Sequence, residues 1–328
     1  MAVATMAGPE NAAVRELAGQ VKLLRQKVQA EVGRVVVGME GVTEQLLIAL
    51  LGNGHVLLEG VPGVAKTTLA KAFARILGCQ YQRVQFTPDL LPSDVTGTYI
   101  FDRKTNEFIL RKGPIFCQVL LADEINRAPA KTQSALLEAM QEIQVTIEGT
   151  TLPLSPPFLV LATQNPVEQE GVYRLPEAQL DRFLLRVEMG YPGHDAEVRM
   201  LKLHSHPVEV PQVLFTAEQI NHIQEIVPQV YGTDGLLHYI VNLAEASRDH
   251  PDLALGASPR AALCLLRCAR ARAILDGRHY FTHEDVQAVA LGVLGHRLIL
   301  RPEAEVEGKR VADVVSDLLG AVPVMDTK

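Results

Sequence analysis

The sequence lacks several features that mark particular classes of protein. It contains no tryptophan, and only 5% of its 328 residues are aromatic, so we expect a core of aliphatic side chains. Its four cysteines show no paired spacing that would indicate a disulfide framework. Cys264 and Cys268 lie four residues apart on a predicted helix, where burial as small apolar groups is more common than metal binding. No apolar run reaches the roughly 18 residues needed to span a bilayer.

Further absences bear on location and partners. The first ten residues contain no basic region followed by an apolar stretch, so nothing predicts a secretory leader and we expect a cytoplasmic protein. The net charge of −7 opposes non-specific binding to nucleic acid, which requires a dense cationic face. The guanine-reading motif Asn-Lys-x-Asp is also missing, and this favours ATP over GTP as a nucleotide ligand.

The most informative segment that is present follows a short apolar run at residues 56–58. A buried strand, a glycine-rich turn and a Lys-Thr pair that opens a helix together predict a loop that binds polyphosphate. Backbone N–H groups surround the phosphates, Lys66 reaches the terminal ones, and the Thr67 hydroxyl binds Mg²⁺. Ala65 replaces a glycine that is usual here, which is tolerable if its φ is negative. The predicted loop and helix start comprise Gly60, Val61, Pro62, Gly63, Val64, Ala65, Lys66, Thr67 and Thr68.

Two acids, Asp123 and Glu124, end another apolar run at residues 119–122. At the carboxyl edge of a parallel sheet, beside a phosphate-binding loop, Asp123 would hold Mg²⁺ and Glu124 would orient and polarise an attacking water. The alternative is a simple solvated turn after the strand. The phosphate-binding loop earlier in the chain favours the catalytic interpretation.

The hydrophobic pattern of the first part of the chain alternates between strands and helices. Short apolar runs are separated by longer segments with a helical period. This alternation is typical of a parallel sheet covered by helices on both faces, the α/β class. The expected strands lie at residues 56–59, 81–86, 119–122 and 158–163.

After the turn at residues 191–193 the pattern changes to helix after helix. Capping boxes open helices at Thr216 and Thr282, and Ser258 precedes another helix. We therefore expect a second, smaller domain made of helices. The predicted division is a disordered tail (1–9), an α/β nucleotide-binding domain (10–190) and a helical domain (191–328).

Two more polar residues become site candidates. Asn165 follows the strand at residues 158–163, where its amide can touch the γ-phosphate or the water, although an Asn before proline often only starts a turn. Arg260 lies in the first turn of a helix, where the helix dipole disfavours a cation. Its position therefore invites an external anion, and a nucleotide phosphate fits.

Five motifs resemble, in their order, those of the MoxR family of AAA+ ATPases: GVPGVAKT, LLADEINRAP, LATQNP, YRLPEAQLDRF and GASPRA. The resemblance covers nearly the whole chain, and the family's alanine before the loop lysine accounts for Ala65. It implies a P-loop AAA+ parallel sheet with flanking helices, followed by a smaller all-helical lid domain. The implied activity is Mg²⁺-dependent hydrolysis of the β–γ anhydride of ATP in a homo-oligomeric ring, most simply a hexamer.

The resemblance also assigns roles to individual residues. It places the arginine that completes a neighbour's site at Arg182, for which the alternative is an ion pair with Asp181 or Glu177 on its own helix. It makes Arg260 the second sensor, acting on the nucleotide of its own subunit or of a neighbour. Arg127 is a weaker candidate for the subunit interface. The implied adenine-bracketing segment is Val36, Val37 and Gly38.

Residues 97–113 and 144–157 each predict a β-hairpin insertion. The resemblance implies that both hairpins project into the channel of the ring and engage a client. The second contains no Lys or Arg, so a polypeptide is favoured over DNA, which needs cations. The implied work is chaperone-like remodelling, maturation or metal or cofactor insertion in partners, some carrying a von Willebrand factor A domain. An ATP-gated regulatory protein and a DNA translocase remain alternatives.

Overall fold

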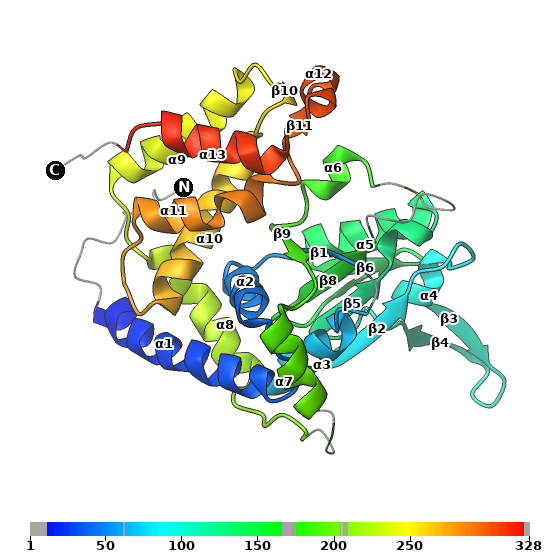
Figure 1. The fold of residues 1–328 in the computed structure, drawn as a ribbon. Coiled ribbons are helices and arrows are strands. Elements are labelled where there is room, and N and C mark those ends of the chain that lie inside the picture. The colour runs from blue at the N-terminus through cyan, green and yellow to red at the C-terminus, as the bar shows by residue number, and fades with distance from the viewer. Residues whose placement is uncertain are drawn as a thin grey trace.

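The computed structural model describes residues 12–61, 63–165, 173, 175–203, 205 and 209–324. An α/β region with a central sheet is followed along the chain by a region composed mostly of helices (Figure 1). The predicted tail at residues 1–9 lies outside the described residues.

A five-stranded sheet forms the centre of the α/β region. Its strands are β1 (Val56–Gly60), β2 (Tyr81–Gln85), β5 (Val119–Asp123), β8 (Leu159–Gln164) and β9 (Leu185–Met189). Their order is β2-β5-β8-β1-β9, and every neighbouring pair is parallel, which confirms the predicted sheet. The sequence did not predict β9, because this edge strand carries charged residues that interrupt its apolar pattern. One of them, Arg186, forms ion pairs with Glu59 at 3.7 Å and Glu188 at 3.0 Å.

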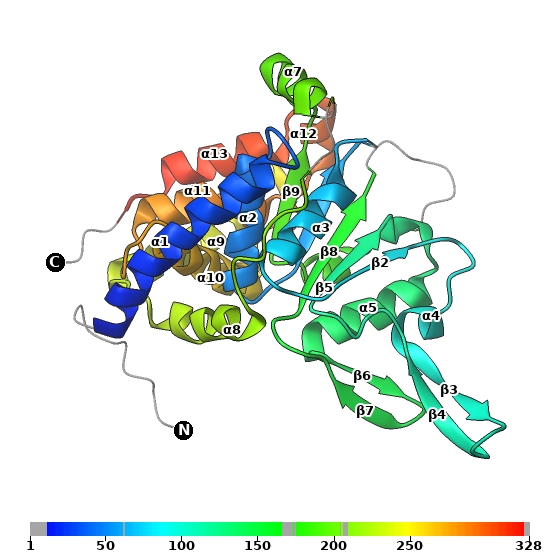
Figure 2. The ribbon, with the colours of Figure 1, turned by 90° about the horizontal axis from the view of Figure 1, so that it is seen from below.

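Helices cover both faces of this sheet (Figure 2). They are α1 (Ala12–Gly33), α2 (Glu40–Leu51), α3 (Lys66–Ile76) and α5 (Ala130–Glu142). Because successive side chains of a strand point to opposite faces, β1 contributes to two cores. Val56 and Leu58 pack with α1, α2 and α3, whereas Leu57 packs with α5.

Two antiparallel hairpins extend from the α/β region on the same side of the sheet (Figure 2). They follow the short helix α4 (Pro92–Thr96) and the helix α5, respectively: β3 (Gly97–Asp102) pairs with β4 (Glu107–Lys112), and β6 (Gln144–Ile147) with β7 (Thr150–Pro153). The hairpins touch, since the Thr98 hydroxyl donates to Glu148 Oε1 at 3.4 Å. Because β7 leads directly into β8, the second hairpin lies at the edge of the sheet opposite the carboxyl ends of the strands.

The helical region follows two short helices, α6 (Glu177–Leu180) and α7 (His194–Leu203). It comprises α8 (Ala217–Ile226), α9 (Asp234–Arg248), α10 (Pro259–Leu275), α11 (His283–Leu294), α12 (Pro302–Val306) and α13 (Val311–Ala321). It also contains one short antiparallel pair, β10 (Leu253–Leu255) and β11 (Ile299–Leu300), that the sequence pattern did not predict. The predicted capping boxes at Thr216 and Thr282 are present, and Ser258 caps α10.

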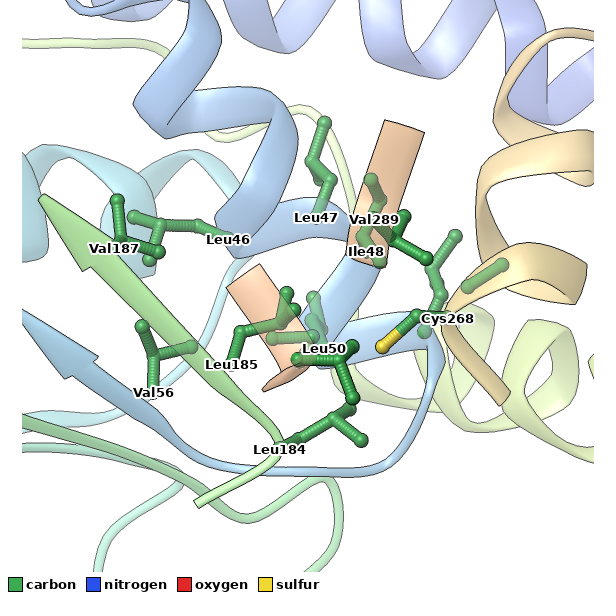
Figure 3. Close-up of a cluster of buried hydrophobic side chains, with 14 of the residues drawn as sticks. Leu46, Leu47, Ile48, Leu50, Val56, Leu184, Leu185, Val187, Cys268 and Val289 are labelled. Carbon is green, nitrogen blue, oxygen red and sulfur yellow. The ribbon is translucent and has the colours of Figure 1, made fainter. Parts of the chain in front are cut away.

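One continuous apolar core joins the two regions. In Figure 3, leucine side chains of α2 lie between the sheet edge formed by β1 and β9 and the helices α10 and α11. Leu46 and Leu50 are among them, and Cys268 and Val289 contribute from the helical side. All four cysteines are free and buried, and the described part of the chain contains no group of three or more His, Cys, Asp or Glu side chains placed to hold a metal ion. None of the helices described is long and apolar enough to cross a membrane.

Candidate active site

A pocket of about 310 Å³ opens at the carboxyl edge of the sheet, where β1, β5 and β8 end. The lining residues are Gly63, Ala65, Lys66, Thr67, Thr68, Asp123, Glu124, Thr163 and Asn165. The structure therefore brings together the predicted loop, the acid pair and the asparagine. Pro62 lies outside the described residues.

The loop between β1 and α3 has a strained backbone at its last residue. Ala65 adopts φ 59° and ψ 24°, so the condition under which a side chain would be free of strain here, a negative φ, is not met. A left-handed conformation costs a residue with a side chain about 1–2 kcal/mol. Such strain is typical of functional sites, where the surrounding structure enforces it. Gly63 also has a positive φ of 88°, and there glycine bears it without penalty.

Lys66 begins α3 and carries a partly buried ammonium group. Its Nζ donates a hydrogen bond to the carbonyl of Gly60. Burial lowers the pKa of Lys66, while the nearby carboxylates of Asp123 and Glu124 act to raise it. A phosphate in the pocket would replace a neutral carbonyl partner by an anionic one, which forms a stronger, charge-assisted hydrogen bond. The residues present therefore fit a polyphosphate.

The two acids are connected to each other by a threonine of the neighbouring strand. The Thr163 hydroxyl donates to Asp123 Oδ1 at 2.6 Å and accepts from the backbone N–H of Glu124 at 2.8 Å. Thr163 is only 1% exposed, so this geometry is held inside the protein. Glu124 itself has a left-handed backbone, with φ 56° and ψ 50°. A second strained residue thus lies in the same pocket.

Strand β2 supplies further partners to the acids from the other side. Arg83 donates from Nε and Nη2 to Asp123 Oδ2 at 3.0 and 2.7 Å. Gln85, two residues on and therefore on the same face of β2, donates to Glu124 Oε2 at 2.6 Å. Arg127 forms an ion pair with Glu124 at 3.2 Å, and its place at a subunit interface stays a prediction.

The oxygen donors at this site suit a hard cation. The Thr67 hydroxyl and the Asp123 carboxylate both line the pocket, and Mg²⁺ prefers a few such oxygens, completed by water and substrate phosphates. Asn165, 8% exposed, lines the same pocket. The arrangement can hold a metal–polyphosphate complex beside a carboxylate able to act as a base.

Arg182 and Arg260 are not among the residues that line this pocket. Arg182 lies in the turn between α6 and β9, and Arg260 in the first turn of α10. Among the described residues, neither guanidinium has a hydrogen-bond or ion-pair partner. Asp181, the neighbour that might have paired with Arg182, instead binds Arg297 at 2.7 Å.

The residues of the proposed adenine segment are also not among those that line the pocket. Val36, Val37 and Gly38 follow the end of α1, and Val37 lines a separate hollow of about 790 Å³ between α1 and α7. Gly38 has φ 78°, and a Cβ there would lie 3.1 Å from that of Ala196. Contact of this segment with adenine stays a prediction.

Sequence reasoning missed Thr163, Arg83 and Gln85. The sequence feature that could have identified them is their position, because each lies at or near the carboxyl end of a strand. Only the strand order shows that β5, which carries the acids, lies between β2 and β8.

Comparisons with known proteins agree with this geometry. The family model "ATPase family associated with various cellular activities (AAA)" matches residues 55–185, and the model "AAA lid domain" matches residues 245–318. The chain is 48% identical to the uncharacterized protein YeaC of Bacillus subtilis, over 91% of this chain and 94% of YeaC. It is 46% identical to the chaperone MoxR1 of Mycobacterium tuberculosis, over 88% and 78%. A crystal structure from Cytophaga hutchinsonii, assigned as an ATPase, has a TM-score of 0.90 and 42% identity, over 97% of this chain and 100% of that one.

Proposed function

Because the chain belongs to the MoxR family of AAA+ ATPases, we propose that it hydrolyses ATP at the pocket described above. The reaction is the attack of water on the γ-phosphorus, which breaks the β–γ anhydride and releases ADP and phosphate. We propose further that the energy drives chaperone-like remodelling of client proteins by a ring of identical subunits, most simply a hexamer.

The observation that carries the proposal is the convergence of the loop lysine, the acid pair and Asn165 on one pocket. Lys66 and the loop N–H groups bind the phosphates, and Glu124 accepts a proton from the attacking water. Thr67 and Asp123 would hold Mg²⁺, which when bound would neutralise part of the charge on the phosphates. The hydroxyl of Thr163 bonds to both acids and so fixes the position of Asp123 relative to Glu124.

Arg182 and Arg260 are proposed to act on the pocket of a neighbouring subunit. Both lack a partner among the described residues, and neither lines the pocket of its own chain. A guanidinium from a neighbour would neutralise charge that builds on the transferred phosphoryl group, a contribution of about 10³–10⁵ in rate in related nucleotidases. The site would then be complete only in the assembly.

The first hairpin is the proposed contact with clients. Phe101 and Phe108 face each other across β3 and β4 with ring centroids 5.4 Å apart, yet they are 50% and 70% exposed. Ile100 and Ile109, the next pair along the ladder and therefore on the opposite face of the hairpin, are also exposed. Exposed apolar side chains of this kind suit contact with a polypeptide segment. The family resemblance adds proteins with a von Willebrand factor A domain as a candidate class of client.

Three single variants test the ATPase proposal. Lys66→Ala should abolish nucleotide binding, while the matched variant Lys71→Ala, which changes an exposed lysine of the same helix, should bind normally. Glu124→Gln should bind ATP without turning it over, and Arg182→Ala should bind ATP but hydrolyse it poorly. Binding is measured with a fluorescent nucleotide and turnover by phosphate release.

A site that is completed by a neighbouring subunit can be distinguished from a site that is complete within one chain by mixing two inactive variants. Glu124→Gln chains, which keep Arg182, should restore turnover when mixed with Arg182→Ala chains, which keep an intact pocket. Wild-type turnover per chain should also fall on dilution to the monomer. Equal turnover per chain in the monomer would contradict the shared site.

A further inference from the structure

Arg297, in the turn between α11 and β11, is an almost fully buried arginine, and Asp181 is its one acidic partner among the described residues. Its side chain is 3% exposed, and its Nε donates to Asp181 Oδ1 at 2.7 Å. Burying a cation is unfavourable unless its donors are satisfied, and a guanidinium has five of them in a fixed fork. The groups that accept hydrogen bonds from the other donors therefore indicate the structural role of Arg297.

The remaining donors of Arg297 bind the backbone on both sides of Arg182. Nη2 donates to the carbonyls of Asp181 at 3.2 Å and Phe183 at 2.6 Å, and Nη1 to the carbonyl of Leu184 at 3.4 Å. Nη1 also donates to the carbonyl of Val293 in α11. A single side chain of the lid thus holds the short segment that presents Arg182.

The adjacent residue, His296, strengthens this attachment. Its Nε2 lies 3.1 Å from the carbonyl of Phe183. Burial lowers the pKa of His296 well below its ordinary value, so the ring is neutral and Nε2–H donates. From the other side, the carbonyl of His55 accepts from the N–H of Leu184 at 2.8 Å. The Leu184 side chain is buried near Leu50 of α2 (Figure 3).

The same guanidinium touches the helix that carries Arg260. Nη2 of Arg297 lies 3.4 Å from Sγ of Cys264, and Cys264 is four residues after Arg260 on α10. Residues four apart lie on one face of a helix, so Arg260 is one turn from this contact. Arg297 therefore connects the backbone that presents Arg182 to the helix that presents Arg260.

We propose that Arg297 is a positioning residue that fixes Arg182 and Arg260 relative to one another, so that both reach a neighbouring subunit's nucleotide as one unit. This inference rests on the proposed function, in which Arg182 acts on a neighbour. A lid that moves relative to the sheet would then either carry the Arg182 segment with it or break these hydrogen bonds.

The test uses two full-length defective chains that complement each other in a mixed assembly. The arginine donor is Glu124→Gln, and the pocket donor is Arg182→Ala. Arg297→Met is added to one chain at a time, and phosphate release is measured after size-exclusion chromatography has verified assembly. Arg297→Met on the arginine donor should lower the restored rate about 100-fold, which is the effect expected when a catalytic group is misplaced by about 1 Å. On the pocket donor, which has no Arg182 to misplace, the rate should change little.

The asymmetry is the decisive result, because general destabilisation would lower the rate in both placements. Arg301→Met on the arginine donor is the matched control, since the side chain of Arg301, within the part of the chain that the structure describes, donates only inside the lid, to the carbonyl of Leu253 at 3.1 Å. It should leave the restored rate unchanged. Equal loss in both placements, or no loss on the arginine donor, overturns the role of Arg297. If the parent chains fail to complement while Arg297 is intact, the shared site itself is wrong.

Discussion

The bridging hydroxyl of Thr163 offers a sharp test of the catalytic geometry. Thr163→Val keeps the shape of the side chain but removes both the hydrogen bond to Asp123 at 2.6 Å and the acceptor for the N–H of Glu124 at 2.8 Å. A hydrogen bond to a charged group is worth about 1.5–3 kcal/mol. At about 1.4 kcal/mol per tenfold in rate, its loss should lower kcat by about 10- to 150-fold.

The assay compares kcat and nucleotide affinity for wild type, Thr163→Val and Thr163→Ser. Affinity should change less than kcat in the valine variant, because the hydroxyl touches the acids and not the phosphate-binding loop. Serine retains the hydroxyl, so its kcat should stay near that of wild type. A valine variant with wild-type kcat, or a serine variant as slow as valine, would refute this account of the acid pair.

Three further predictions concern stability and client binding. Ala65→Gly should raise the free energy of unfolding by about 0.5–1 kcal/mol in urea denaturation, because relief of the left-handed strain exceeds the added chain entropy; a lower stability would contradict the strain argument. Burial lowers the pKa of His55 from 6.5 to about 4, so the unfolded chain binds the extra proton between these values and stability falls as the pH falls. Between pH 7 and pH 5 the free energy of unfolding of wild type should therefore fall by about 2 kcal/mol more than that of His55→Gln. Glutamine keeps a hydrogen-bond donor and an acceptor but does not titrate in this range. Equal losses of stability in the two proteins would argue against His55 as the source. Replacing Phe101 and Phe108 together by serine should reduce the client protein that co-purifies with the Glu124→Gln form in ATP, without changing the melting temperature; undiminished capture would exclude the hairpin as the contact.

The sequence predicted those parts of the site that are contiguous in the chain. The loop around Lys66 and the acids at the end of β5 are short segments in which neighbouring residues act together. Local spacing predicted the loop, and the presence of the loop then favoured a catalytic role for the acids over a solvated turn. The capping boxes of the helical region were predictable for the same reason, since each is closed within four residues.

Features that depend on the order of the strands were not predictable in this way. Thr163 and Arg83 meet Asp123 only because β5 lies between β2 and β8. The contact between Arg297 and Asp181 spans 116 residues of sequence, and a buried arginine cannot be recognised before its acceptors are known.

The apolar core shared by the sheet and the lid determines how the chain can be divided. The leucines of α2 are covered on one side by β9 and on the other by α10 and α11 (Figure 3). A fragment cut near residue 190 would leave this leucine-rich face open to water and prone to aggregate. Biochemical dissection of the protein should therefore rely on point substitutions in the intact polypeptide rather than on isolated halves.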